Sequence, residues 1–304
     1  GQNAFSYTQI ESISIPMSVE CIVRRAFYMC KNLQKIELHS TSKLTKIEKE
    51  AFAYTSILNV FIPSAVSCIE EGAFSFCRNL KYVEFESNSN LTTISDLLFS
   101  NSALKTISIP DGIKIIGKFA FKKCYNLKSI EFSKNSELKS ICEGAFSRSN
   151  IKTMKIPSSC NNIEKHAFSR CKLLKTVDFS LVSNFSLLED ELFFHSSIQF
   201  IAIPSSVTKI GKRAFSWCQK LNTIQFSEDS NLKIICESAF MYSSLTKITI
   251  PSSVNEMKKF AFYKCGNLNI EFSPNSQLSI LEGCSFSETG ISKIILPSNL
   301  RKLE

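Results

Sequence analysis

Twelve cysteines and three histidines are the residues of this 304-residue chain best suited to hold a metal or act as nucleophiles. Zinc sites need paired cysteines or cysteine–histidine clusters at short spacings, and the sequence has no C-x-x-C pair. His39, His166 and His195 do not stand beside a serine or cysteine at the spacing of a nucleophile motif. No glycine-rich phosphate-binding motif and no H-E-x-x-H occurs. The sequence therefore predicts no enzyme, no metal site and no cofactor.

Half of the cysteines recur at intervals of 47 residues. They are Cys30, Cys77, Cys124, Cys171, Cys218 and Cys265. Parallel strands stack about 4.8 Å apart, so cysteines two coils apart would be separated by about 10 Å, beyond the roughly 7 Å reach of a disulfide. We therefore predict twelve free thiols. Serine or threonine takes the same position in the alternate coils, and we expect this column to cap the turn before each strand.

Phenylalanine marks the repeat along the whole chain. Thirteen phenylalanines are separated alternately by 22 and 25 residues, with a final spacing of 24. They are Phe5, Phe27, Phe52, Phe74, Phe99, Phe121, Phe146, Phe168, Phe193, Phe215, Phe240, Phe262 and Phe286. Such a period is typical of a solenoid, in which each coil packs only against its neighbours. We predict a single array over residues 1–304, with about 13 coils in 47-residue double repeats and the phenylalanines in one buried column.

Residues 197–243 show how one double repeat predicts its elements. In the first half, apolar residues have the spacing of a strand with one buried face, and Pro204 ends that strand because it cannot donate to a ladder. A second apolar pair ending at Ile210 predicts another extended piece. Ala214 follows four residues later, at the spacing of one helical turn, and Phe215 then enters the core. The second half is built alike, with a longer polar loop in place of the proline turn.

The repeat L-x-x-I-x-I-P-x-x-V-x-x-I-x-x-x-A-F-x-x-C resembles the leucine-rich repeat of BspA-like surface antigens. Residues 203–207 (Ile-Pro-Ser-Ser-Val) and 214–218 (Ala-Phe-Ser-Trp-Cys) are especially similar, and the resemblance covers the whole chain. It implies a leucine-rich repeat solenoid with a right-handed parallel β-sheet on the inner face and with short helical or 3-10 turns and extended segments outside. It also implies a surface protein that adheres to host tissue or matrix. The Ser-, Asn-, Lys- and Ile-rich composition resembles the protist, trichomonad-like members.

The bulk composition excludes several classes of protein. The 36 basic and 27 acidic residues are spread along the chain without the basic block that is typical of a nucleic-acid binder. No stretch approaches 18 apolar residues, and no signal-peptide pattern opens the chain. Because neither end has a polar capping repeat, we expect a fragment that lacks both end caps. Two glycosylation sequons begin at Asn90 and Asn184, and whether they carry glycan stays open.

The exposed face of the predicted sheet is where a solenoid offers binding area. Most of its positions hold threonine, serine or charged residues, which a solvated sheet explains by itself. Bulky apolar groups interrupt this pattern at Leu58, Phe61 and Tyr82, and again at Phe200. Lysine precedes five successive strands, at Lys81, Lys105, Lys128, Lys152 and Lys175. Because aromatic anchors dominate interface energies and lysines steer acidic partners, these nine residues are the candidate ligand-binding site.

These features predict a non-enzymatic cell-surface or secreted scaffold that binds a host or matrix protein through the inner face of its sheet. The alternative is an intracellular leucine-rich repeat scaffold or regulator that binds a protein partner. Free thiols fit a reducing cytosol, whereas the family resemblance favours the surface. We expect no nucleic-acid partner and no membrane span. The sequence leaves the ligand, its affinity and the oligomeric state open.

Overall fold

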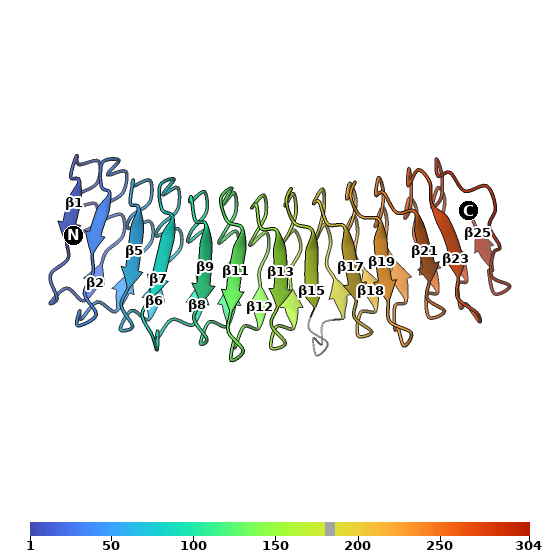
Figure 1. Cartoon of the computed structure of the whole chain (residues 1–304), viewed down its shortest axis with the longest axis horizontal. Coiled ribbons are helices and arrows are strands. Elements are labelled where there is room, and N and C mark those ends of the chain that lie inside the picture. The colour runs from blue at the N-terminus through green and yellow to red at the C-terminus, as the bar shows by residue number, and fades with distance from the viewer. Residues whose placement is uncertain (180–185) are drawn as a thin grey trace. The chain divides into compact units, whose positions relative to one another are not determined.

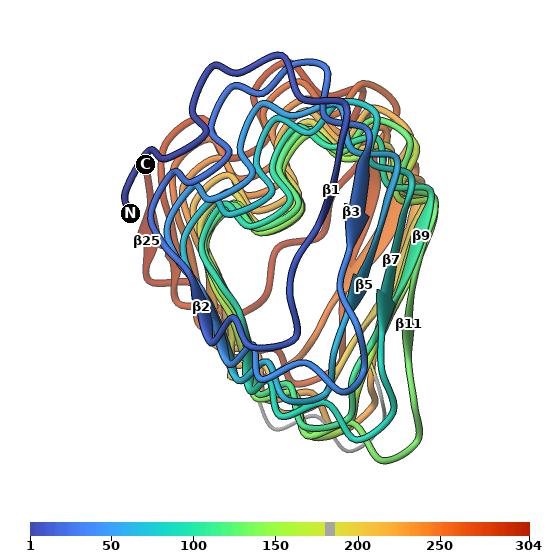
Figure 2. The ribbon, with the colours of Figure 1, turned by 90° about the vertical axis from the view of Figure 1, so that its left-hand side faces the viewer.

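The computed structural model describes residues 1–179 and 186–304, so the second sequon, at Asn184, lies outside the described residues. The chain divides into two compact units, Gly1–Ile151 (unit 1) and Lys152–Glu304 (unit 2). In each unit, successive coils contribute strands to two rows of parallel strands (Figures 1 and 2). We call the row of odd-numbered strands the main sheet, and the row of even-numbered strands, with β25, the second sheet. This arrangement confirms the predicted parallel solenoid fold for each unit.

The main sheet contains the strands predicted from the L-x-x-L-x-L pattern. In unit 1 they are β1 (Ser12–Ser14), β3 (Lys35–Glu37), β5 (Asn59–Ile62), β7 (Tyr82–Phe85), β9 (Thr106–Ile109) and β11 (Ser129–Phe132). In unit 2 they are β13 (Thr153–Ile156), β15 (Thr176–Phe179), β17 (Phe200–Ile203), β19 (Thr223–Phe226), β21 (Lys247–Ile250) and β23 (Asn269–Phe272). Every second one from β5 to β21 ends at the residue before a proline, as expected.

Neighbouring main-sheet strands pair in register, so each position forms a row across the coils. In β13 and β15, Met154 pairs with Val177, and both are buried. The next pair, Lys155 and Asp178, is exposed. This alternation follows from the pleat of a strand, which directs successive side chains to opposite faces. A residue type repeated at one position therefore becomes a continuous row on either the core side or the solvent side.

The second sheet is made of two-residue strands, which are the predicted extended segments. Unit 1 contributes β2 (Cys21–Ile22), β4 (Lys46–Ile47), β6 (Cys68–Ile69), β8 (Thr93–Ile94), β10 (Ile115–Ile116) and β12 (Ser140–Ile141). Unit 2 contributes β14 (Asn162–Ile163), β16 (Leu187–Leu188), β18 (Lys209–Ile210), β20 (Ile234–Ile235), β22 (Glu256–Met257), β24 (Ile280–Leu281) and β25 (Lys302–Leu303). From β2 to β24, the second residue of each strand is buried and closes the core opposite the main sheet.

The prediction of helical turns around each Ala-Phe pair is wrong, because the described residues contain no helix. The chain there forms consecutive turns in which alternate N–H groups have different partners. The N–H of Phe52 donates to the carbonyl of Ala73 in the next coil at 2.9 Å, whereas that of Ala53 donates back to Glu50 at 3.2 Å. Alternate backbone N–H groups of these turns therefore form a ladder between coils. An α-helix would not allow this, because its N–H groups donate to carbonyls within the same helix.

The backbone conformation explains these turns. The residues two before and two after each marker phenylalanine have positive φ angles in all thirteen repeats. Only Gly72 and Gly144 among these 26 positions are glycine, and the others include bulky residues such as Trp217 (φ 62°). Side chains in this left-handed region cost about 1–2 kcal/mol each, so the ladder between coils must offset strain at every turn.

The phenylalanine column is confirmed. Within each unit, successive rings stack with centroids 5.0–6.0 Å apart. Phe121 is fully buried, as are the marker phenylalanines from Phe52 to Phe262. The exceptions are Phe5, which is 42% exposed, and Phe286, which is half-buried. These two rings lie in the first and last coils and have a stacking partner on one side only.

The column of cysteine, serine and threonine forms the expected hydrogen-bonded ladder. In both units, a hydroxyl oxygen lies 3.2–3.6 Å from the sulfur of the cysteine in the next coil, for example Thr55 from Cys77. The thiols also donate to the carbonyls of marker phenylalanines, such as Cys77 to Phe52 at 3.2 Å. None of the twelve cysteines forms a disulfide in the structure. These contacts give the buried thiols of this column polar partners and fasten the turn to the coil beside it.

Candidate functional site

The structure places Phe61 and Tyr82 on the solvent side of the main sheet in unit 1, with Leu58 exposed just before β5. Leu58 is 39% exposed and Tyr82 is 49% exposed, whereas Phe61 is half-buried. In the pairing of β5 with β7, Tyr82 lies opposite Asn59 and Phe61 lies opposite Glu84. Phe61 and Tyr82 are therefore diagonal neighbours on one face. Long side chains can still touch at the roughly 7–8 Å of such a diagonal.

The lysines predicted beside this patch form a row in unit 1. The N–H of Lys81 donates to the carbonyl of Leu58 at 2.9 Å, that of Lys105 to Lys81 at 3.2 Å, and that of Lys128 to Lys105 at 2.9 Å. The Nζ of Lys105 also donates to the hydroxyl of Tyr82 at 3.3 Å and lies 5.5 Å from the centre of its ring. One end of the lysine row is therefore joined to the apolar patch, and Lys105 covers part of the Tyr82 ring.

The remaining predicted site residues lie in unit 2. The N–H of Lys175 donates to the carbonyl of Lys152 at 2.8 Å, so these two lysines continue the same position of the repeat. Phe200 opens β17, pairs with Thr223 of β19 and is 39% exposed. It is a single bulky group on that face, without the apolar neighbours that Tyr82 has in Leu58 and Phe61.

Sequence reasoning missed an aromatic ladder on the turn side of each unit. In unit 1, it consists of Tyr7, Tyr28, Tyr54 and Phe76, with centroids 4.4–5.8 Å apart. In unit 2, it consists of His195, Trp217, Tyr242 and Tyr263, with centroids 4.1–6.1 Å apart. The sequence could have revealed this ladder, since all of these residues stand one or two positions after a marker phenylalanine. Four of these six ring contacts are edge-to-face and two, Tyr54 with Phe76 and Trp217 with Tyr242, are stacked, so the rings pack against one another along the turns.

Two of the histidines lie beside charged side chains, and the buried cysteines have raised pKa values. His166 lies 3.4 Å from Glu191, and His195 lies 2.8 Å from the Nζ of Lys172. Burial, and then the charge of Lys172, lowers the pKa of His195. Burial raises the pKa of Cys77 to about 11 and that of Cys218 to about 12, so these thiols are poor nucleophiles.

No group of three or more His, Cys, Asp or Glu side chains in residues 1–179 and 186–304 is placed to hold a metal ion. The same part of the chain has no helix long and apolar enough to cross a membrane.

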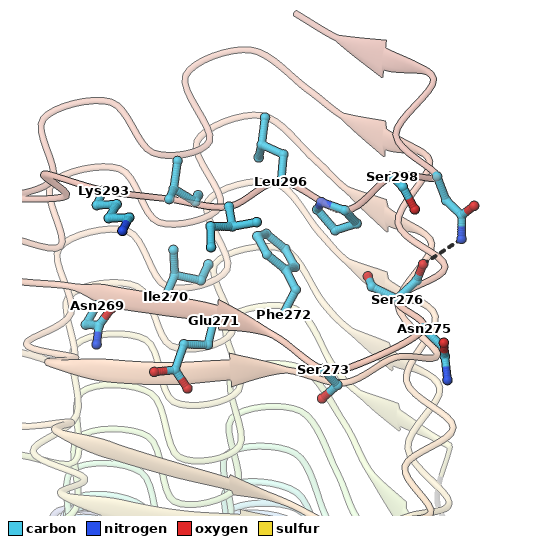
Figure 3. A pocket seen from close by; sticks show the side chains of 14 residues that line it. Asn269, Ile270, Glu271, Phe272, Ser273, Asn275, Ser276, Lys293, Leu296 and Ser298 are labelled. Carbon is cyan, nitrogen blue, oxygen red and sulfur yellow. Dashed lines mark hydrogen bonds between the residues drawn. The ribbon is translucent and has the colours of Figure 1, made fainter.

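A cleft of about 750 Å³ lies beside the last strand of the main sheet in unit 2 (Figure 3). The segment before Pro297 has the spacing of a further strand, but residues 293–296 do not pair with β23. Figure 3 shows Ile270 and Phe272 on the β23 side of this cleft and Leu296 on the other. Asn299 donates to the carbonyl of Ser276 at 2.8 Å and joins the two sides at one end.

Comparison with known proteins identifies the repeat. The model of the BspA type leucine-rich repeat region, which spans six copies, matches residues 1–113, 92–198 and 186–304. Together these matches cover the whole chain. No curated protein matches the sequence.

Solved structures are similar to the chain over nearly its full length. A leucine-rich repeat protein from Bacteroides ovatus is 25% identical, with a TM-score of 0.79, and the match covers 95% of this chain and 79% of that one. The pneumococcal vaccine antigen PcpA is 20% identical, with a TM-score of 0.56 and coverage of 95% and 73%. A leucine-rich repeat protein from Eubacterium ventriosum is 22% identical, with a TM-score of 0.53 and coverage of 96% and 87%. The last two similarities concern the fold alone.

Proposed function

Because the chain belongs to the BspA type leucine-rich repeat family, we propose that it is a non-enzymatic scaffold that binds a protein at the cell surface. Leucine-rich repeat proteins of this kind are generally protein-interaction scaffolds, and neither the matched family nor the similar structures indicate an enzyme. We further propose that the chain is part of a surface or secreted protein that adheres to a host or extracellular-matrix protein. We also propose that it comes from one of the protist, trichomonad-like members of the family.

The observation that supports this function is the apolar patch of Leu58, Phe61 and Tyr82 on the main sheet of unit 1. Leu58 and Tyr82 are exposed where most positions of this face hold polar or charged residues. An aromatic and an aliphatic anchor side by side are typical of the centre of a protein interface. The row from Lys81 to Lys128 would accelerate association with an acidic partner, an effect that salt weakens.

Binding of the purified chain to a panel of immobilised extracellular-matrix proteins tests this proposal. We expect saturable binding to at least one of them. Phe61→Ser combined with Tyr82→Ser should weaken that binding by more than about 2 kcal/mol, as the loss of hot-spot residues does. Ile115→Ser is the matched control, because Ile115 is 39% exposed on β10 of the second sheet. Equal affinity of a folded double variant and the wild-type chain would exclude this patch as the binding site.

The alternative is an intracellular scaffold that binds a protein partner through the same face. The twelve cysteines, none of which forms a disulfide, favour it, since thiols persist in a reducing compartment. Labelling intact cells with an antibody raised against this chain separates the two locations. Staining without permeabilisation is expected for the surface protein, and staining only after permeabilisation would support the intracellular alternative.

A further inference from the structure

Positive charge is concentrated on one edge of unit 1. This basic edge consists of the segments that run from a marker phenylalanine toward the main sheet, residues 74–81, 99–105, 121–128 and 146–151. They contain seven basic residues and no acidic one: Arg78, Lys81, Lys105, Lys122, Lys123, Lys128 and Arg148. Unit 1 as a whole has 18 basic and 14 acidic residues, a net charge of +4. The rest of the unit therefore carries a net charge of −3, and the edge carries the entire excess.

The cations of the basic edge lack acidic partners. Among the described residues of unit 1, none of the seven forms an ion pair. Five basic residues elsewhere in the unit do form them: Arg25, Lys35, Lys46, Lys49 and Lys114. Burial, followed by the nearby charges of Lys123 and Arg148, lowers the pKa of Lys122. This edge is thus a set of crowded cations that nothing in the described chain neutralises.

The geometry of the edge is linear. The backbone ladder from Lys81 through Lys105 to Lys128 sets one cation on each coil, about 4.8 Å apart. Beside this row, an open recess of about 440 Å³ lies between Arg78 and Lys123. The amides of Asn101 and Asn126 line the recess.

The same recess presents one aromatic ring. Tyr125 is 56% exposed there. The edge thus joins repeated positive charge to neutral groups that can donate and accept hydrogen bonds.

We propose that the basic edge of unit 1 binds a linear acidic polysaccharide, with its cations on the sulfate or carboxylate groups and its amides on the sugar hydroxyls. The regular row of cations matches a polymer that carries charge in every repeat. The recess lacks a cluster of apolar anchors of the kind that a protein partner would need. Nucleic-acid strands are held by successive aromatic platforms, and Tyr125 is a single exposed ring. This ligand class goes beyond the proposed protein-binding function and uses other residues than the apolar patch.

Binding of the whole chain to heparin, a sulfated polysaccharide, tests this inference. Neutral dextran, a single-stranded DNA oligonucleotide and polyglutamate serve as competitors. Arg78→Gln, Lys123→Gln and Arg148→Gln combined should weaken heparin binding by about tenfold or more, and should flatten its dependence on salt. The matched control combines Lys118→Gln, Lys134→Gln and Lys139→Gln, which remove the same charge from exposed positions of unit 1 outside the edge. Its affinity should stay within about twofold of the wild type.

Several results would overturn the inference. These are equal weakening by the two triple variants, tighter binding of the DNA or of polyglutamate than of heparin, or no binding of heparin. If the first triple variant does not fold, Lys105→Gln with Lys128→Gln removes two cations of the row and should weaken heparin binding several-fold. Phe61→Ser alone keeps Tyr82 as the partner of Lys105 and should leave heparin binding unchanged, so failure of the proposed protein-binding site and failure of the basic edge are distinguishable.

Discussion

Replacing Phe121 by alanine should show how much one ring of the core column contributes to stability. Phe121 is fully buried and stacks on Phe99 at 5.7 Å and on Phe146 at 5.3 Å. Removing a buried phenylalanine costs about 3–5 kcal/mol, because the apolar contacts are lost and a cavity remains. Each stacked pair adds about 0.5–1.5 kcal/mol beyond the buried area, which favours the upper part of that range.

Phe5→Ala is the matched control, since the same atoms are removed from the same position of the repeat. Phe5 is 42% exposed and stacks on one ring only, that of Phe27. Partial burial of a phenylalanine stabilises by about 1–2 kcal/mol, so the control should cost clearly less than Phe121→Ala. The difference between the two variants isolates the contribution of the second neighbour and of full burial.

Urea unfolding followed by far-ultraviolet circular dichroism measures this difference. Long repeat arrays need not unfold as one unit, so hydrogen exchange of peptides from β9 and β11 should accompany it. We expect faster exchange in these strands for Phe121→Ala and little change there for Phe5→Ala. A cost below about 1 kcal/mol for Phe121→Ala, or equal costs for both variants, would contradict a continuous column in which each ring is held from two sides.

Three further predictions concern the turns and the thiols. Gly72→Ala should lower the free energy of unfolding by about 1–2 kcal/mol, and Ser238→Gly should raise it by up to about 1 kcal/mol, because both positions have positive φ. Urea titration measures both changes. A stabilising Gly72→Ala or a destabilising Ser238→Gly would contradict backbone strain at these turns. Iodoacetamide at pH 8 should modify Cys68 rapidly and Cys218 only after unfolding. Cys68 is exposed, whereas burial raises the pKa of Cys218 to about 12. Mass spectrometry of the alkylated chain measures both rates. The free energy of unfolding should also fall above pH 9, because unfolding lets the buried thiols ionise at their ordinary pKa of 9.0; a flat profile would contradict this.

The regular parts of the fold could be predicted because they depend on residues with strict requirements. Pro110 cannot donate to a ladder, and β9 ends at the residue before it. Phe121 needs a neighbour on both sides, and a fixed period supplies one. The strands and the core column follow from such constraints.

The turns could not be predicted in the same way. The apolar residues of the segment have a four-residue spacing that a helical turn and a chain of tight turns share. Glycine usually reveals positive φ, but Phe119 and Trp217 adopt it here, held by the ladder to the next coil. For example, the N–H of Trp217 donates to the carbonyl of Met241 at 2.8 Å. This tertiary contact overrides the local preference, and no pattern within a single repeat reports it.

The candidate site was predictable only in part. The exposure of Tyr82 follows from strand alternation. Leu58 does not follow it, since alternation would bury Leu58 with Val60 and Ile62, yet it is exposed just before β5. The cover of Tyr82 by Lys105 depends on how a long side chain reaches across coils. The sequence identified Lys81, Lys105 and Lys128 of the basic edge but missed Arg78, Lys122, Lys123 and Arg148. The cations are separated along the chain by strands and loops that carry the acidic residues, so the edge as a whole was not recognised. Summing charge by position in the repeat, rather than along the sequence, would have revealed it.

A solenoid of this kind separates the residues that bind from the residues that fold. Arg78 and Lys128 are exposed on an edge whose backbone is fixed by hydrogen bonds to the next coil, so their side chains can change without altering the core. Lys123 and Arg148 are different, because each occupies a position of positive φ. Glycine at either position would remove a cation and relieve strain together, and would therefore weaken heparin binding while stabilising the fold. Opposite changes in affinity and stability from one substitution are what distinguish a binding edge from a structural one.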